Sequence, residues 1–283
     1  MNVQENNRYI LGGKKMKKVN HKRMLAVLVM MVMSMSSLMA CTGESKKEAE
    51  PKIEGELFIA AAASLEYAYT EELIPMFQTQ YPDIIVTGTY DSSGKLQTQI
   101  EEGLEADIFM SAATKQMNAL LEQGLIEAES VVELLENKIV LIVPANSDLA
   151  IATFEEIINA DIIAVGDPES VPAGQYAKEA LTNLGLWDVV EKKMSMGTNV
   201  TEVLNWVAEG SANAGIVYAT DAATTDSVKV VAEAPEQSLA TKVIYPVGVL
   251  ANSEQKEIAE LFIEFLQSKE AMEVFEEYGF TAN

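Results

Sequence analysis

Short apolar segments rich in β-branched residues alternate with amphipathic segments from Ile53 to the end of the chain. This alternation is typical of βα units, which build sheets of parallel strands covered by helices, so the sequence predicts an α/β body. We expect strands at Glu56–Ala61, Ile84–Thr89, Asp107–Met110, Lys138–Val143, Ile162–Val165, Gly215–Tyr218, Val228–Val231 and Val243–Leu250. We expect helices that begin near Ser64, Ser93, Thr114, Thr153, Ala173, Val200, Ser253 and Lys269.

Two apolar strands that contain proline divide this body. They are Val140–Pro144 and Tyr245–Val249, and we interpret them as two crossings between lobes. We therefore assign residues 53–142 together with 247–283 to lobe 1, and residues 143–246 to lobe 2. Open α/β sheets bind ligands beyond the carboxyl ends of their strands, so we expect a ligand cleft between the lobes.

The N-terminal segment has the order of a secretory signal. Six basic residues between Lys14 and Arg23 precede an apolar run from Met24 to Met39. A basic region followed by a short apolar run and small residues is typical of a signal peptide. We predict that residues 1–40 are removed, with the start codon at either Met1 or Met16 left open.

Cys41 is the only cysteine in the chain and follows the apolar run at once. The preceding residues resemble the lipobox of bacterial lipoproteins, so we predict that Cys41 is lipidated. Residues 41–52 then form the lipidated N-terminus and a polar tether. A lipid holds a protein on a membrane without embedding it, so we expect an extracytoplasmic lipoprotein.

The predicted mature chain contains neither arginine nor histidine, because Arg8, His21 and Arg23 all lie in the signal. This absence excludes Ser-His-Asp and Cys-His nucleophiles, imidazole metal ligands and arginine clamps for phosphate. Residues 1–40 hold seven of the 20 basic residues and one of the 43 acidic ones, which leaves a net charge of −29. We therefore expect no nucleic-acid partner, since like charge repels.

Four junctions place small or hydroxyl residues where a helix begins. They are Ala61–Leu65, Ser92–Gly94, Pro172–Gly174 and Gly197–Val200. The unpaired N–H groups of a helix N-terminus attract anions. One serine before a helix is ordinarily only an N-cap. Four such junctions in a chain without arginine or histidine favour an anion that neutral donors hold.

Several longer stretches have a recognisable order along nearly the whole mature chain. They are Ala60–Leu65, Ser92–Leu96, Val165–Glu169, Val171–Leu181, Gly215–Tyr218 and Tyr278–Phe280. Together they resemble the periplasmic molybdate-binding protein of ABC importers. The resemblance implies a two-lobed periplasmic-binding-protein fold of type II, with a mixed, mainly parallel sheet in each lobe. It implies a binding protein and not an enzyme, without a cofactor or a coordinated metal cation.

The resemblance also implies the ligand, its partners and the site. A monomer would capture molybdate, and also tungstate, and deliver it to the permease and ATPase of an ABC importer. The donors would be the hydroxyls and amides of Ser64 and Ser93, the amides of Ala173 and Val200, and the hydroxyl of Tyr218. Such a site suits a fully deprotonated dianion, because it offers no acceptor for a ligand proton.

Asp91 lies close to Ser93 at a position where we expect a small neutral residue. Its carboxylate would oppose a bound anion, so we predict that it faces solvent. Three other functions stay open: a receptor for sulfate or another tetrahedral oxyanion, a hydrolase that uses Ser64, and an anchored sensor without transport. The hydrolase is disfavoured because Ser64 has no histidine to act as its base.

Overall fold

The computed structural model describes residues 53–283. The predicted signal peptide, the lipidation site Cys41 and the tether up to Lys52 lie outside the described residues. Residues 52–283 form one compact unit. Within residues 53–283, no helix has both the length and the apolar character that crossing a membrane requires.

Six strands form the first sheet, in the order β11-β4-β10-β3-β1-β2. They are β1 (Gly55–Ala62), β2 (Ile84–Asp91), β3 (Ile108–Met110), β4 (Val132–Asn137), β10 (Val243–Val249) and β11 (Thr281–Ala282). β1 runs parallel to β2 and β3, whereas β10 runs antiparallel to β3 and β4. All of β10 and most of β1 are buried on both faces, which explains their continuous apolar sequences.

Five strands form the second sheet, in the order β7-β6-β8-β5-β9. They are β5 (Ile139–Pro144), β6 (Ile163–Gly166), β7 (Met194–Gly197), β8 (Ala214–Tyr218) and β9 (Val228–Glu233). β6 runs parallel to β7 and β8, whereas β5 runs antiparallel to β8 and β9. The predicted α/β fold with two mixed sheets is confirmed. Lobe 1 contains the first sheet and lobe 2 contains the second.

The chain changes sheet at two places. The first is Lys138, between β4 and β5, and the second is the segment 234–242, between β9 and β10. Both places lie a few residues before the predicted crossings. The prediction placed the crossings too late because it used proline as their marker. Pro144 instead ends β5 within the second sheet, and Pro246 lies at a register shift inside β10. A bulge tolerates the missing N–H of proline without ending the strand.

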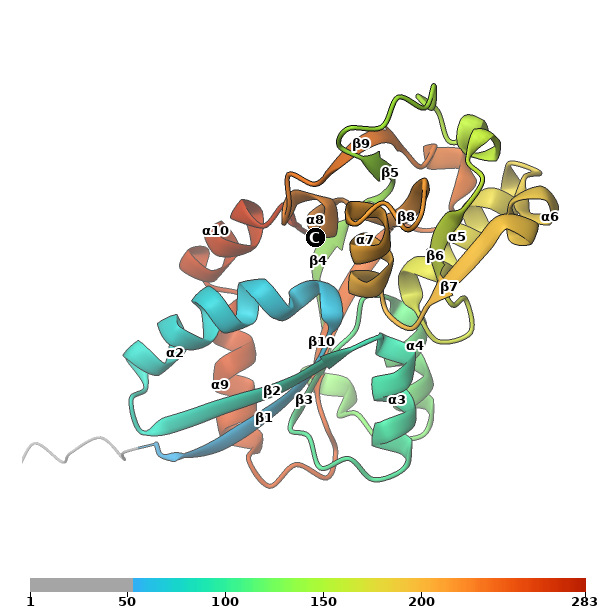
Figure 1. The fold of residues 1–283 in the computed structure, drawn as a ribbon. Coiled ribbons are helices and arrows are strands. Elements are labelled where there is room, and N and C mark those ends of the chain that lie inside the picture. The colour runs from blue at the N-terminus through green and yellow to red at the C-terminus, as the bar shows by residue number, and fades with distance from the viewer. Residues whose placement is uncertain (1–52) are drawn as a thin grey trace, which may run out of the picture. The chain divides into compact units, whose positions relative to one another are not determined.

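Helices cover both faces of the first sheet (Figure 1). One face packs against a continuous helical segment, 63–80, and against α9 (Lys256–Leu266) and α10 (Lys269–Glu277). The segment consists of the 3₁₀ turn η1 (Ala63–Leu65), the π-helix η2 (Ala68–Leu73) and α2 (Ile74–Gln80). The other face packs against α3 (Ser93–Glu101) and α4 (Thr114–Glu122). Successive residues of β1 accordingly belong to different apolar clusters, since side chains alternate along a strand.

The second sheet packs against α5 (Pro172–Asn183), α7 (Val200–Ala208) and the short helix α8 (Ala219–Ala223). The remaining short elements are η3 (Ala128–Ser130), η4 (Glu155–Asn159), α6 (Trp187–Val190), η5 (Glu191–Lys193) and η6 (Glu236–Ser238). The helix predicted near Thr153 is therefore only the 3₁₀ turn η4. Ile157 is the only buried residue of this turn, so the segment lacks the apolar face that packs a longer helix, and the chain returns to a strand at Ile163.

Aromatic side chains fill the apolar layer between the helical segment 63–80 and α9. Phe77 is fully buried, and its ring centroid lies 4.9 Å from that of Phe262 and 5.4 Å from that of Phe265. The Phe77–Phe262 pair meets edge to face, the arrangement that the charge distribution of the rings favours. This cluster joins the first and last parts of lobe 1 into one core.

Phe77→Ala should lower the free energy of unfolding by about 3–5 kcal/mol, because it empties a packed aromatic site. Ile85→Ala is the matched control, because Ile85 lies on β2 and is 54% exposed. We expect the control to cost about 1 kcal/mol or less. Urea unfolding of both variants measures the difference, and equal costs would contradict the proposed role of the cluster.

Candidate functional site

Each predicted site residue lies at or shortly after the carboxyl end of a strand, and Figure 1 shows the helices α3, α5 and α7 that follow such strands. β1 leads into η1, which contains Ser64, and β2 leads into α3, which begins at Ser93. In lobe 2, β6 precedes α5 and β7 precedes α7, while Tyr218 is the last residue of β8. Parallel strands end at the same edge of a sheet, so the topology itself gathers these junctions.

The peptide groups of Ala112 connect two of the predicted residues across the lobes. The amide of Ala112 donates to the hydroxyl oxygen of Ser93 at 3.0 Å, and the hydroxyl of Tyr218 donates to the carbonyl of Ala112 at 3.2 Å. Ser93 is fully buried and Tyr218 is 1% exposed. Burial raises the pKa of the Tyr218 hydroxyl well above its usual value of 10.0, so the group stays a neutral donor.

Ser64 is joined to the same network through Tyr245. Its hydroxyl oxygen lies 3.0 Å from that of Tyr245, whose ring packs edge to face on Tyr218 with centroids 5.5 Å apart. The amide of Asn137 donates to Tyr245 at 3.2 Å and to the hydroxyl of Thr220 at 2.9 Å. Burial also raises the pKa of Tyr245 well above 10.0. Through Tyr245 and Asn137, Ser64 is thus connected to Thr220 in lobe 2.

The first turn of α5 holds Ala173 against the end of β6. Pro172 occupies the first turn, where its missing N–H removes no helical hydrogen bond. Gly174 approaches β6 so closely that a Cβ atom there would lie 2.0 Å from the carbonyl oxygen of Gly166. Glycine is therefore required for this contact. Ala173 itself is fully buried.

The start of α7 is fixed by reciprocal capping. The side-chain oxygen of Asn199 accepts from the amide of Glu202 at 2.9 Å, and the Glu202 carboxylate accepts from the amide of Thr198 at 2.6 Å. The bond from Glu202 satisfies an amide that a helix start otherwise leaves unpaired, and the bond from Thr198 holds the residue before the cap. Val200 follows the cap directly and is 4% exposed.

Further hydrogen bonds join the helix starts of the two lobes. The amide of Gly94 donates to the carbonyl of Ser170 at 2.9 Å, and the side-chain amide of Gln116 donates to that of Gln175 at 3.1 Å. Gly94 follows Ser93, and Ser170 lies three residues before Ala173. The structure thus brings the starts of α3 and α5 together. Hydrogen bonds link three of the predicted donors, Ser64, Ser93 and Tyr218, to Ala112 or Tyr245, whereas no hydrogen bond within the described part of the chain connects Ala173 or Val200 to them.

The prediction that Asp91 faces solvent is wrong, because its side chain is half-buried. Its side chain is 28% exposed and forms an ion pair with Lys95 at 3.2 Å. The same carboxylate oxygen accepts from the amide of Ser92 at 2.7 Å and lies 3.4 Å from the side-chain nitrogen of Asn199 in lobe 2. Three N–H donors stabilise the charge in this half-buried place.

The starts of α3 and α5 favour an anion, unlike that of α7, whose first turn contains Glu202. α3 and α5 have no acidic residue in their first turns, so their positive ends are not neutralised there. The hydroxyl of Ser92, which is 3% exposed, has no hydrogen-bond partner among the described residues. Within residues 53–283, no group of three or more His, Cys, Asp or Glu side chains is arranged to hold a metal ion.

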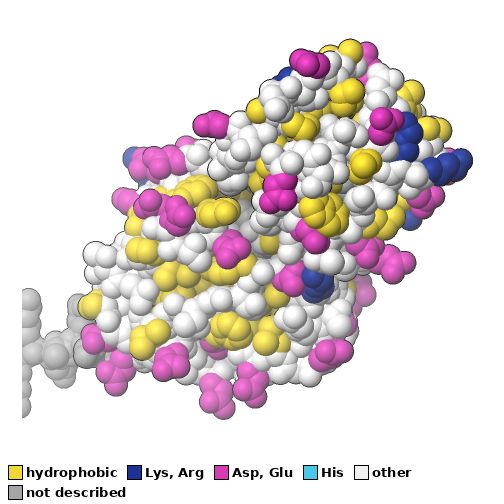
Figure 2. Space-filling view, in the orientation of Figure 1, with side chains coloured by type: hydrophobic (Ala, Val, Ile, Leu, Met, Phe, Trp, Pro, Cys, Tyr) yellow, Lys and Arg dark blue, Asp and Glu magenta, His cyan; other side chains and the backbone are white. Residues whose placement is uncertain are grey.

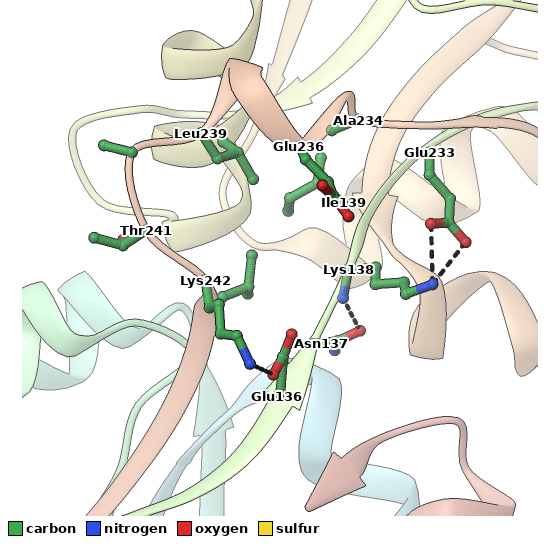
Figure 3. A pocket seen from close by; sticks show the side chains of 12 residues that line it. Glu136, Asn137, Lys138, Ile139, Glu233, Ala234, Glu236, Leu239, Thr241 and Lys242 are labelled. Carbon is green, nitrogen blue, oxygen red and sulfur yellow. Dashed lines mark hydrogen bonds and ion pairs between the residues drawn. The ribbon is translucent and has the colours of Figure 1, made fainter. Parts of the chain in front are cut away.

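A separate pocket of about 480 Å³ lies where the chain changes sheet (Figure 3). It is lined by residues 136–139, Glu233, Ala234, Glu236 and 239–243. Two ion pairs border it, Lys138 with Glu233 at 3.0 Å and Lys242 with Glu136 at 2.6 Å. None of the predicted ligand residues lines this pocket, so it is a feature of the crossings and not of the anion site.

Comparison with known proteins assigns the fold to a family. The model of the bacterial extracellular solute-binding proteins matches residues 57–281. This chain belongs to that family. Its members are binding proteins, in agreement with the interpretation of the site as a place that holds a solute.

Three relatives of this solute-binding protein are informative. A Bacillus subtilis protein with the provisional name ABC transporter substrate-binding lipoprotein YvgL is 42% identical over 85% of this chain and 91% of its own. The molybdate-binding protein ModA of Haemophilus influenzae is 38% identical over 79% of this chain and 89% of its own. A solved domain, provisionally assigned to a molybdenum ABC transporter of Clostridium difficile, is 38% identical with a TM-score of 0.63. It covers 80% of this chain and 98% of that one.

Sequence reasoning missed Ala112, Tyr245 and Asn199. Ala112 contributes only backbone groups, which leave no trace in the residue type. Tyr245 was assigned to a crossing strand and not to the site. Asn199 carried a usable signal, because asparagine directly before a helix is among the best N-caps, and it precedes the predicted ligand residue Val200.

Asp221 gives this region a pH dependence. Its carboxylate is 5% exposed and accepts from the amide of Tyr218 at 3.1 Å. Burial raises the pKa of this carboxyl from 3.8 to about 7, although the hydrogen bond from Tyr218 opposes the shift. The folded chain therefore holds this proton more tightly than the unfolded chain. The resulting stabilisation is present at low pH and is lost as pH rises through about 7.

Asp221→Asn should weaken this pH dependence, because the amide cannot ionise yet still accepts from Tyr218. Between about pH 5 and about pH 8, the wild type should lose on the order of 3 kcal/mol more unfolding free energy than the variant. Urea unfolding at the two pH values measures it. Asp226→Asn is the control, because Asp226 is exposed. Identical pH profiles for wild type and Asp221→Asn would rule out the buried ionisation.

Proposed function

We propose that this solute-binding protein captures molybdate outside the cytoplasm and delivers it to an ABC importer. The observation that carries the proposal is the 38% identity over 229 residues to a relative named a molybdate-binding protein. The 42% identity to a relative named as a substrate-binding lipoprotein of an ABC transporter supports delivery to an importer. Tungstate is a second ligand in this proposal, because it offers the same tetrahedral dianion.

The proposed ligand donors are Ser64, Ser93, Ala173, Val200 and Tyr218. The arrangement of the hydroxyl donors supports this, since Ser93 and Tyr218 from the two lobes both bond to Ala112, and Ser64 bonds to Tyr245 beside Tyr218. Each hydrogen bond to a charged ligand contributes about 1.5–3 kcal/mol, so five to seven of them suffice for micromolar binding or better after the cost of immobilisation. No cofactor is part of this proposal.

The acidic character of the protein does not prevent anion capture. Figure 2 shows Asp and Glu side chains spread over the surface, with few Lys side chains among them. At physiological salt, exposed charges farther away than about 8 Å are largely screened. Amides and hydroxyls at hydrogen-bond distance act in a buried place, where screening is weak, so the local donors decide the sign of the interaction.

An enzymatic role for Ser64 lacks support in the geometry. The group beside its hydroxyl is the hydroxyl of Tyr245, at 3.0 Å. Burial holds the pKa of Tyr245 well above 10.0, so this group is a poor base near neutral pH. The chain from residue 41 onward contains no histidine. We therefore propose a binding protein without catalytic activity.

The proposal for location and assembly follows from the N-terminal sequence and the relatives. The lipid on Cys41 would hold the folded unit on the outer face of the cell membrane, with residues 42–52 as the tether. The permease and ATPase of the importer are the proposed partners, and the binding protein acts as a monomer. The alternative function is a sulfate receptor, and comparing the affinities for sulfate and molybdate distinguishes the two.

Calorimetric titration of residues 42–283 with molybdate, tungstate, sulfate and phosphate tests the ligand. This segment contains the whole compact unit 52–283, with both sheets. We expect tight one-to-one binding of molybdate and tungstate, weak binding of sulfate, and no heat with phosphate. Ser93→Ala should weaken molybdate binding by about tenfold or more, because a buried donor to a charged ligand is lost.

Ser227→Ala is the control for the titration, because Ser227 is exposed directly before β9 and is not one of the proposed donors. Thermal unfolding without ligand separates a binding defect from a folding defect in Ser93→Ala. Preference for sulfate over molybdate would replace the proposed ligand, and the absence of heat with all four anions would refute the oxyanion receptor.

Cys41→Ser tests the anchor. The hydroxyl of serine does not replace the thiol that receives the lipid, so the variant should leave the membrane fraction. Ser45→Ala in the tether is the control and should stay in that fraction. Cell fractionation with an immunoblot measures both variants. Retention of Cys41→Ser on the membrane would contradict lipidation at Cys41.

A further inference from the structure

Asp91 and Asn199 join the two lobes beside the proposed anion site. Asp91 ends β2 in lobe 1, and Asn199 caps α7 in lobe 2. The side-chain nitrogen of Asn199 lies 3.4 Å from a carboxylate oxygen of Asp91, across 108 residues of sequence. Both side chains are partly buried.

Asn199 uses both ends of its side-chain amide. Its oxygen accepts from the Glu202 amide at 2.9 Å and so caps α7, which leaves the nitrogen free to point at Asp91. The cap fixes the orientation of the amide, since a flipped amide would lose the bond to Glu202. The donor to Asp91 is therefore held in place before the lobes meet.

Lys95 reduces the repulsion that the Asp91 carboxylate would exert on a bound anion. Lys95 lies in the first turn of α3, and its ammonium is 3.2 Å and 3.3 Å from the two carboxylate oxygens of Asp91. The amide of Ser92 adds a bond of 2.7 Å. The carboxylate thus has a compensating charge within lobe 1, and its repulsion of an anion at Ser93 is reduced.

We propose that Asp91 and Asn199 form a closure latch that positions the two halves of the anion site. Asp91 lies two residues before Ser93, and Asn199 lies directly before Val200. Their contact sets the separation of the starts of α3 and α7, which carry these two proposed donors. Both residues are positioning residues that act through Ser93 and Val200 and do not touch the ligand.

Lys95 also contributes to the latch, because it compensates the charge of Asp91. Because Lys95 neutralises Asp91, the pair joins the lobes without adding a net charge next to the ligand. Closure then favours the bound state, so the latch acts mainly on the rate at which the ligand leaves. This inference rests on the proposed function for its ligand, whereas the contact itself is between residues of the two lobes.

An exchange of the two side chains tests the latch. Asn199→Asp keeps a good N-cap for α7 but places a carboxylate opposite Asp91, so repulsion replaces the bond. We expect its dissociation constant for molybdate to rise by about tenfold or more. Asp91→Asn alone should change it within about threefold, because two amides still bond. The double variant Asp91→Asn with Asn199→Asp restores an amide opposite a carboxylate and should recover most of the affinity.

A distance measurement reports the latch without relying on the ligand. Residues 42–283 contain no cysteine, so spin labels can be attached at Glu102→Cys on lobe 1 and Glu209→Cys on lobe 2. Both positions are exposed at the ends of α3 and α7. We expect Asn199→Asp to shift the ligand-free distance distribution to longer values, and the double variant to reverse the shift. Thermal unfolding confirms that every variant is folded.

The outcomes separate the latch from the proposed function. Recovery of the distance and of the affinity in the double variant supports the latch. A wild type that binds no oxyanion refutes the proposed function, and the ligand-free distances then decide the latch alone. Unchanged distances and an unchanged dissociation constant in Asn199→Asp would overturn the latch. A double variant that recovers neither the distance nor the affinity relative to Asn199→Asp would also overturn it.

Discussion

Ala112 connects the lobes through backbone groups that no side-chain substitution at this position removes. Its amide donates to Ser93 on α3, and its carbonyl accepts from Tyr218 at the end of β8. Both partners are almost completely buried, and unpaired polar groups in such places are costly. The ends of β2, β3 and β8 must therefore meet at one point. The positions of the remaining helix starts follow from this meeting, because each is tied to its own strand.

Where the ends of β2, β3 and β8 meet, the groups proposed to bind the anion are hydroxyl and amide dipoles and not charged side chains. Asp91 is the carboxylate that most nearly opposes this arrangement, and Lys95, Ser92 and Asn199 surround it with N–H groups. Tyr218 and Tyr245 remain neutral because burial raises their pKa values well above the usual range. Hydroxyl and amide donors thus keep the same charge state over a wide pH range. Asp221, with a pKa of about 7, is the exception in this region.

The sequence predicted those parts of the fold that apolar patterns or helix starts encode locally. β1 and β10 are continuous apolar runs, and α3 and α7 begin at the expected residues Ser93 and Val200. β7 was missed because its four residues include no apolar run, and α8 because it has only five residues. The environment of Asp91 was mispredicted for a different reason. Its partner Asn199 lies 108 residues away, and no local pattern reveals such a contact.

Because residues 41–283 contain no arginine or histidine, anion binding depends more strongly on closure of the two lobes than it would with a cationic side chain in the site. A fixed positive charge in one lobe would attract an anion even when the lobes are apart. Here Ser93 belongs to lobe 1 and Tyr218 to lobe 2, so the proposed set of donors is complete only when Ala112 and Tyr218 are in contact. Ligand affinity and lobe contact are then one equilibrium, in which each favours the other. An importer that recognises both lobes at once would therefore distinguish loaded from empty protein without contacting the anion.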